Sequence, residues 1–299
     1  MVGARTVLKD ERADSDGATV LVVLSNPGHV DQLLRTATDL TAGGEVLVVS
    51  VIHKPVTSPF LLFSEGHIHD EFDDSRPPVL ERASVLAEDS SVPIRRHLLV
   101  GSDVSEAILT AQRESDADAI LLGWQDRARP SDIVLGATVD RVVGRAPCNV
   151  YVERVGTTAD RVERVLLPTV GGPHLEPATE LVEAVARAND ADVTVVSYVG
   201  HGAGDSDRAA ARDHVERAAS LLAAVETGTV VESTDDVAGS IVTLAADHDL
   251  VVLGATRERA LLRPVVGSVA ETVAREAAPP VVIAKRRADR SLLGRMLHR

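Results

Sequence analysis

The chain carries one pattern of short aliphatic runs, separated by stretches of helix length, twice over. Residues 116–123 read DADAILLG, and residues 247–254, 131 positions later, read DHDLVVLG. A second pair of glycines, Gly136 and Gly267, keeps the same interval. Alternating strands and helices predict right-handed βαβ units and a parallel sheet. The repeat therefore predicts two copies of one α/β fold.

Each copy holds five runs rich in Val, Ile and Leu, and with aromatic residues at only 2% these side chains must fill the cores. Such runs are typical of parallel strands buried on both faces. The expected strands are residues 19–24, 45–52, 93–100, 117–122 and 149–153 in the first copy and 164–168, 192–199, 228–232, 249–253 and 280–285 in the second. We therefore predict α/β domains at residues 18–154 and 162–286, each with a five-stranded parallel sheet, and a basic tail at residues 287–299.

The composition argues against several classes of protein. The formal net charge is −14, which is unsuited to nucleic-acid binding through a positive field. The single cysteine, Cys148, allows no intrachain disulfide, and no apolar run reaches the ~18–20 residues that span a bilayer. Residues 1–17 lack the apolar core of a signal peptide. We therefore expect a soluble, cytoplasmic protein without nucleic-acid partners.

A glycine motif follows the fourth expected strand of the second copy. It reads Gly254-Ala-Thr-Arg257, then nine residues, then Gly267-Ser268. It resembles the motif of ATP-binding members of the universal stress protein family, which have Gly, two residues, Gly, nine residues, Gly and then Ser or Thr. The resemblance extends over residues 19–153 and 164–285. It implies two tandem Rossmann-like (adenine nucleotide alpha hydrolase-like) domains with strand order 3-2-1-4-5 and a ligand crevice between the ends of the first and fourth strands.

The crevice of the second copy is the predicted site for ATP or a related adenine nucleotide. Glycine allows close backbone approach, and the helix expected to begin here presents free N–H groups to an anion. Two departures from the family pattern predict weak binding: Arg257 replaces the second glycine, and Val170 replaces the carboxylate after the first strand. Arg257 either pairs with a phosphate or is a solvated loop residue. The predicted site residues are Thr169, Val170, Gly254, Arg257, Gly267 and Ser268.

The first copy departs further from the family pattern. Asp126 replaces the second glycine, Ala137 replaces the Ser or Thr, and Ser25 stands where the family has its carboxylate. A carboxylate beside a phosphate is repulsive, and the missing hydroxyl removes a hydrogen bond. We therefore expect unequal crevices, with any nucleotide bound in the second copy.

No group of residues suggests catalysis. Asp247, His248 and Asp249 are adjacent, but they lie at the entry of an expected strand, the end opposite the crevice. His67 and His69 have no second His or Cys cluster to complete a metal site, so no metal is expected. The chain is therefore predicted to be a non-catalytic binding or regulatory module. The alternatives are a true ATP- or AMP-binding stress sensor, a regulatory domain pair for a membrane transporter, and a weak ATPase or nucleotidyl-transfer enzyme on the same fold.

Further features bear on partners. Segments 25–27, 121–124 and 168–174 resemble the stress-protein tandems in the cytosolic tails of amino-acid permeases, which implies a transporter or another protein partner. Members of the family pair through their last strand, whose edge needs a partner. Residues 149–152 are therefore expected to pair with residues 281–284, which gives an intramolecular pseudo-dimer that is open to further homodimerisation.

The basic tail has two interpretations. Leu292, Leu293, Met296 and Leu297 recur at helical spacing among basic residues, a pattern that predicts weak contact with an anionic membrane surface or an acidic partner. The other interpretation is a frayed terminus, or a helix docked on its own domain.

Overall fold

The computed structural model describes residues 5–10, 17–41, 43–53, 78–125, 136–159, 161–255 and 267–287. These residues divide into two compact units. The first contains the described residues up to Gly123 together with Gly136–Cys148. The second contains Trp124, Gln125 and the described residues of Asn149–Arg287.

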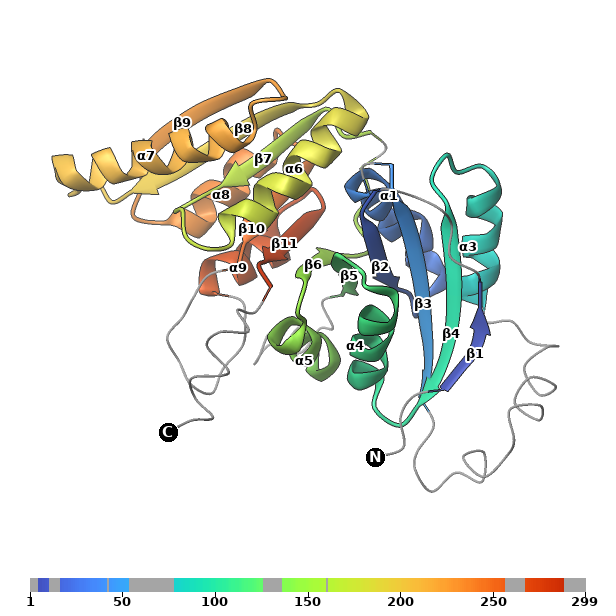
Figure 1. Cartoon of the computed structure of the whole chain (residues 1–299). Helices are drawn as coiled ribbons and strands as arrows, with labels where there is room; N and C mark the ends of the chain where they lie inside the picture. Colours follow the sequence, from blue (N-terminus) through green and yellow to red (C-terminus); the bar gives the residue numbers. More distant parts are fainter. Residues whose placement is uncertain are drawn as a thin grey trace, which may run out of the picture. The chain divides into compact units, whose positions relative to one another are not determined.

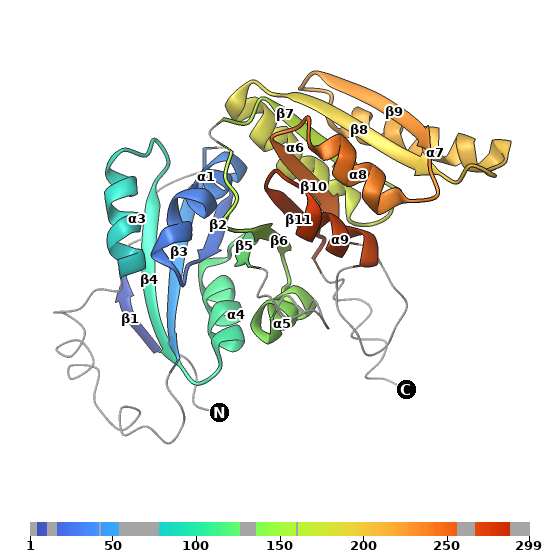
Figure 2. The ribbon, with the colours of Figure 1, turned by 180° about the vertical axis from the view of Figure 1, so that it is seen from behind.

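The first unit is a sheet covered by helices on both faces (Figures 1 and 2). Its strands follow the order β1-β4-β3-β2-β5, and only β1 is antiparallel to its neighbour. The strands are β1 (Arg5–Lys9), β2 (Thr19–Val23), β3 (Glu45–His53), β4 (Ile94–Gly101) and β5 (Ala119–Trp124). The helices are η1 (Pro27–His29), α1 (Val30–Leu40), α3 (Pro78–Glu88), α4 (Val104–Ser115) and α5 (Ala137–Arg145). Helix α1 packs beside α3, and α4 packs beside α5 on the opposite face, as right-handed crossovers require.

The second unit repeats this plan. Its strand order is β6-β11-β10-β7-β8-β9, and only β6 is antiparallel to its neighbour. The strands are β6 (Asn149–Arg154), β7 (Arg164–Pro168), β8 (Asp192–Val199), β9 (Thr227–Ser233), β10 (Leu250–Gly254) and β11 (Val281–Lys285). The helices are α6 (Leu175–Asn189), α7 (Asp205–Leu221), α8 (Val237–Ala245) and α9 (Ser268–Glu276).

The α/β class is confirmed, but the strands of the two copies do not form two independent parallel sheets. The predicted order 3-2-1-4-5 is present as β9-β8-β7-β10-β11 in the second copy and as β4-β3-β2-β5-β6 in the first. Strand β6, the fifth strand of the first copy, groups with the second unit and runs antiparallel to β11. The predicted strand pairing is therefore present, with Val152 opposite Ile283 and Tyr151 opposite Ala284. An exposed edge of unpaired backbone groups explains why β11 takes a partner strand.

Buried aliphatic side chains stabilise the strands. Val46, Leu47, Val48 and Val49 in β3 are all 0% exposed, so this strand is buried on both faces. Full burial of a Val or Leu side chain contributes about 1.5–3 kcal/mol each. The unbroken aliphatic runs therefore form the central layer from which the loops of the site extend.

Arg154 ties β6 to the end of α9. Its side chain is buried, and its guanidinium donates to the carbonyl oxygens of Ala277 and Pro279 at 2.7 Å each and of Ala274 at 2.9 Å. Carbonyls in the last turn of a helix have no partner within the helix, so a buried arginine fork can satisfy several at once. Arg154 thus fixes the helix whose other end forms part of the candidate site.

Candidate functional site

The crevice of the second copy lies where the sheet order reverses. Strands β7 and β10 are parallel neighbours, with Leu250 opposite Val165 and Val251 opposite Leu166. The chain leaves β7 toward β8 on one side, and leaves β10 toward β11 on the other. Loops that leave such neighbouring strands in opposite directions form an opening at their carboxyl ends.

The turn after β7 is held by its own backbone. The Thr169 N–H donates to the Val196 carbonyl at 2.8 Å, and the Thr169 hydroxyl accepts from the Gly171 N–H at 3.0 Å. Gly171 and Gly172 have φ values of +72° and +86°, which non-glycine residues rarely adopt. Val170 at the tip is 64% exposed. The turn therefore presents an aliphatic side chain where the family pattern has a carboxylate.

Gly254 has a packing role at the end of β10. A Cβ atom at this position would lie 3.3 Å from the Cβ of His174, the residue before α6. His174 in turn accepts a hydrogen bond on Nδ1 from the Arg286 N–H at 3.1 Å. The glycine therefore lets β10 approach the protein's own turn, in addition to any approach to a ligand.

Gly267 and Ser268 begin α9. Gly267 is the N-cap, with φ −73° and ψ 161°, and no side chain in the described part of the chain caps it. Gly267 is buried and Ser268 is exposed. The first N–H groups of the helix and the Ser268 hydroxyl thus form a donor set suited to an anion such as a phosphate. Arg257, the remaining predicted site residue, lies outside the described residues.

A pocket of about 480 Å³ lies beside this crevice, next to the carboxyl end of β8 and along α7. Of the predicted site residues that the structure describes, only Val170 lines it. Its polar side chains are those of Ser197, Tyr198, Asp207 and His214. Burial, and then the charge of Glu232, raise the pKa of Tyr198 to about 12, so this phenol stays neutral. The pocket therefore combines an aliphatic wall, formed by residues such as Val170 and Val199, with a few polar side chains.

Sequence reasoning missed the residues on α7. Asp207 accepts from the Gly204 N–H at 3.2 Å and so completes the start of the helix. His214 lies against Gly171, where an added Cβ would come within 2.8 Å of its Cδ2. The glycines at 200, 202 and 204 were the available signal, because they mark a loop that lets a helix begin close to the end of β8.

The corresponding helix of the first copy begins differently. Gly136, the N-cap of α5, has φ +96°, and Ala137 follows it without a hydroxyl. Burial raises the pKa of Asp140 in the first turn, and its Oδ1 has no hydrogen-bond partner among the described residues. The acidic first turn and the missing hydroxyl disfavour an anion here. Asp126, the other predicted difference, lies outside the described residues.

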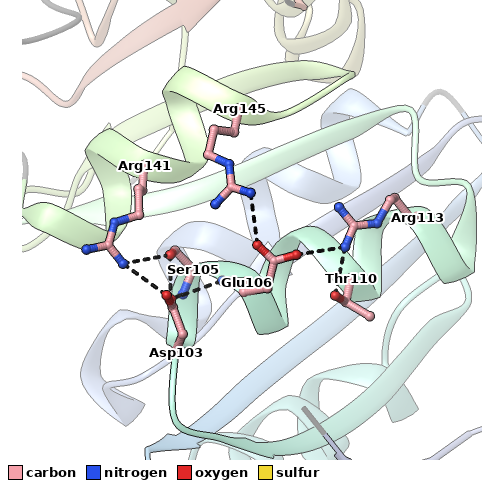
Figure 3. Close-up of polar contacts among 7 residues, drawn as sticks. All are labelled: Asp103, Ser105, Glu106, Thr110, Arg113, Arg141 and Arg145. Carbon is pink, nitrogen blue, oxygen red and sulfur yellow. Dashed lines mark hydrogen bonds and ion pairs between the residues drawn. The ribbon is translucent and has the colours of Figure 1, made fainter. Parts of the chain in front are cut away.

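Ion pairs connect α5 to α4 in the first unit (Figure 3). Asp103 caps α4 and pairs with Arg141 at 3.1 Å, while Glu106 pairs with Arg145 at 3.1 Å and with Arg113 at 3.0 Å. The Ser105 hydroxyl, which donates to Asp103 at 2.6 Å, is the largest cause of the lowered pKa of that carboxyl. These side chains are about half exposed, so each pair contributes little alone. The cluster orients the two helices through bonds among its own members.

Metal-binding groups, a reactive thiol and membrane-spanning helices are also absent from the described residues. No group of three or more His, Cys, Asp or Glu side chains among them could hold a metal ion. Burial raises the pKa of Cys148 to about 12, which keeps its thiol protonated. No helix in the described ranges has the length and apolar character needed to cross a membrane. His67, His69 and residues 288–299 of the basic tail lie outside the described residues.

Known proteins resemble this chain in both of its copies. The model of the universal stress protein family matches residues 18–154 and 161–285. The Na⁺/H⁺ antiporter NhaS5 of Synechocystis sp. is 28% identical over 270 residues, which cover 86% of this chain. The chain spans only 37% of the length of that protein.

Two solved structures are similar in fold to about nine tenths of this chain. A universal stress protein from Archaeoglobus fulgidus aligns with a TM-score of 0.62 at 18% identity, covering 91% of this chain and 97% of that one. The cytoplasmic domain of a prokaryotic cation chloride cotransporter aligns with a TM-score of 0.58 at 11% identity, covering 89% and 95%. At these identities the likeness concerns the fold.

Proposed function

The chain belongs to the universal stress protein family, and from this we propose that it is a non-catalytic binding and regulatory module for a membrane transporter. The observation that carries the proposal is the 28% identity with the antiporter, because it extends over 86% of the chain and so includes both copies. The fold shared with the cytoplasmic domain of the cotransporter is in keeping with this assignment. A regulator of this kind would act on the cytoplasmic side, through domains at residues 18–154 and 162–286.

We further propose that the second copy binds an adenine nucleotide weakly. The start of α9 supplies backbone donors at Gly267 and the hydroxyl of Ser268, which favour a phosphate. The exposed Val170 offers nothing polar to a ribose or adenine, which limits the affinity. The start of α5 in the first copy lacks the hydroxyl and has the half-buried Asp140 in its first turn, which disfavours the same ligand there.

A chimaera tests the regulatory proposal. In the Synechocystis antiporter, the region that matches this chain would be deleted, or replaced by residues 1–299. Na⁺/H⁺ exchange would be measured in everted vesicles from cells that lack other antiporters. We expect deletion to change the rate or its dependence on pH, and the replacement to restore the native behaviour at least in part. A chimaera that behaves like the deletion, at equal abundance in the membrane, would contradict the proposal.

Calorimetric titration with ATP, ADP and AMP tests the nucleotide site. Ser268→Ala should weaken binding by about tenfold or more, because a hydrogen bond to a charged group contributes about 1.5–3 kcal/mol. Gly267→Val should abolish binding. The matched control is Ala137→Ser, which adds the hydroxyl to the first copy and should change nothing. Binding that survives both substitutions in α9 would place the ligand elsewhere, and no heat at millimolar nucleotide would favour a crevice without nucleotide.

A further inference from the structure

Strand β9 has one edge that no strand occupies among the described residues. It pairs in parallel with β8 from Thr227 to Ser233 and is the last strand in the order of the second unit (Figure 1). Unpaired backbone groups on a strand edge are a template for another strand unless charge, proline or a covering segment protects them. β9 reads TGTVVES, which contains no proline and a single charged residue, Glu232.

The first unit shows what the equivalent edge accepts. There β4, the counterpart of β9, is covered by β1 in antiparallel orientation. Asp10 anchors that strand, because its Oδ2 accepts from the Arg96 backbone N–H at 2.9 Å and from Nε at 2.8 Å. Ile94 and Thr227 stand at matching positions in the two sheets, so Thr229 is the counterpart of Arg96. The edge of β9 thus lacks the anchor for a segment such as β1.

The free backbone groups of β9 follow from its pairing with β8. The Glu226 carbonyl accepts from the Val193 N–H, and the Thr234 N–H donates to the Val199 carbonyl, so even-numbered residues point toward β8. Successive residues of a strand direct these groups to opposite edges. The residues that point outward are therefore Thr227, Thr229, Val231 and Ser233.

We propose that β9 is a dimerisation edge, at which it pairs antiparallel with β9 of a second copy of this chain. A twofold axis at Val230 sets Thr227 opposite Ser233 and Thr229 opposite Val231, so that every outward N–H and C=O is paired. In this register Glu232 faces Gly228 of the second copy, and no like charges are opposed. A closed twofold contact of one surface with itself is the commonest arrangement in homo-oligomers. The proposal does not depend on the proposed function.

The strength of association follows from the size of the contact. A pair of seven-residue strands is a small interface, and small interfaces are weak or transient. The net charge of −14 on each chain adds repulsion that salt screens. We therefore expect a dimer with a dissociation constant of about micromolar size at 0.5 M salt. Sedimentation equilibrium of the full chain should show twice the monomer mass of 31.6 kDa at high concentration.

Charge substitutions at the axis test the register. Val230→Lys sets two ammonium groups opposite each other and should weaken the dimer about tenfold or more, whereas Val230→Thr should weaken it far less. Val230→Glu alone should behave like Val230→Lys. An equal mixture of the Lys and Glu variants should dimerise again, because opposite charges then face each other. Recovery in the mixture cannot come from a misfolded variant.

A second variant tests the edge without adding charge. Thr229→Pro removes an outward N–H that β8 does not use, so it should weaken the dimer while circular dichroism stays native. Oxidation of Val230→Cys should yield a disulfide-linked dimer, whereas Ser220→Cys on the exposed side of α7 should not; the native Cys148 is buried. A monomer at all concentrations, or a dimer unaffected by Val230→Lys and Thr229→Pro, would overturn the proposal. Loss of the dimer on deletion of residues 1–10 would also overturn it, because that result would indicate that β1 is the strand that pairs between the two copies.

Discussion

Replacing Arg154 should weaken the second unit more than any surface substitution. Arg154 is only 9% exposed and donates at 2.7–2.9 Å to the Ala274, Ala277 and Pro279 carbonyls. Arg154→Met keeps much of the side-chain volume but leaves these acceptors without their donor. The α9 C-terminus also loses a cation that interacts favourably with its dipole.

The expected loss can be bounded. Hydrogen bonds from a charged donor contribute about 1.5–3 kcal/mol each, so three give an upper limit of about 9 kcal/mol. Contributions within one cluster do not add, and water can reach some carbonyls after the change. Truncating one side of a buried charge-assisted network costs about 3–5 kcal/mol, which we expect for Arg154→Met. Arg154→Lys should cost about 1–2 kcal/mol, because an ammonium reaches only part of the set.

Urea unfolding combined with hydrogen exchange measures this effect. The two units need not unfold together, so exchange of the amides in α9 and β11 should be followed separately from the global signal. The control is Arg161→Ala, which removes an ion pair with Glu163 whose side chains are 67% and 63% exposed. That change should cost less than about 1 kcal/mol. A loss below about 1 kcal/mol for Arg154→Met would refute the assignment of Arg154 as the cap of α9.

Three further changes test other parts of the structure. Burial raises the folded pKa of Asp140, so its carboxyl favours folding when protonated, and this contribution is lost as pH rises through the folded pKa. Asp140→Asn should therefore raise the urea midpoint at pH 7 but not at pH 3. Burial, and then neighbouring cations, lower the pKa of His97. The contribution of its neutral imidazole to stability is therefore complete above the unfolded pKa of about 6.5 and is lost as pH falls below that value. The melting temperature should drop between pH 7 and pH 5.5, and should drop less in His97→Gln. Gly171 has φ +72°, and an added Cβ would lie 2.8 Å from His214, so Gly171→Ala should lower the free energy of unfolding in urea by about 1–3 kcal/mol. Gly172 has φ +86° but open space around it, so Gly172→Ala should lower the free energy of unfolding by only about 1 kcal/mol. Equal losses would show that His214 does not restrict this turn.

The sequence predicts most strands because their signal is local. The expected run 45–52 is β3 (Glu45–His53), and the expected run 192–199 is β8. In each case a run rich in Val, Leu or Ile identifies a largely buried strand. Strand β1 (Arg5–Lys9) was missed, because five residues at a sheet edge carry no distinctive pattern, and its position depends on pairing with β4.

The candidate site is less visible in the sequence. The Gly254 motif locates the loops, but its contact with His174 joins residues 80 positions apart. His214 is part of the α7 pattern, and only the folded chain brings it against Gly171. A motif predicts the backbone geometry of a crevice, whereas the side chains that shape the neighbouring pocket come from elements whose contacts are not encoded locally.

The antiparallel pair of β6 and β11 has a consequence for how the two copies can diverge. In separate chains, a contact between equivalent last strands would dissociate on dilution, and every substitution would alter both sides at once. Here residues 155–163 join β6 to β7, and a short connection of this kind holds its ends at an effective concentration of about millimolar. Each copy can therefore accept substitutions without a matching change in the other. Because the two copies are parts of one chain, the residues of their crevices can differ, with Ser268 in the second and Ala137 in the first.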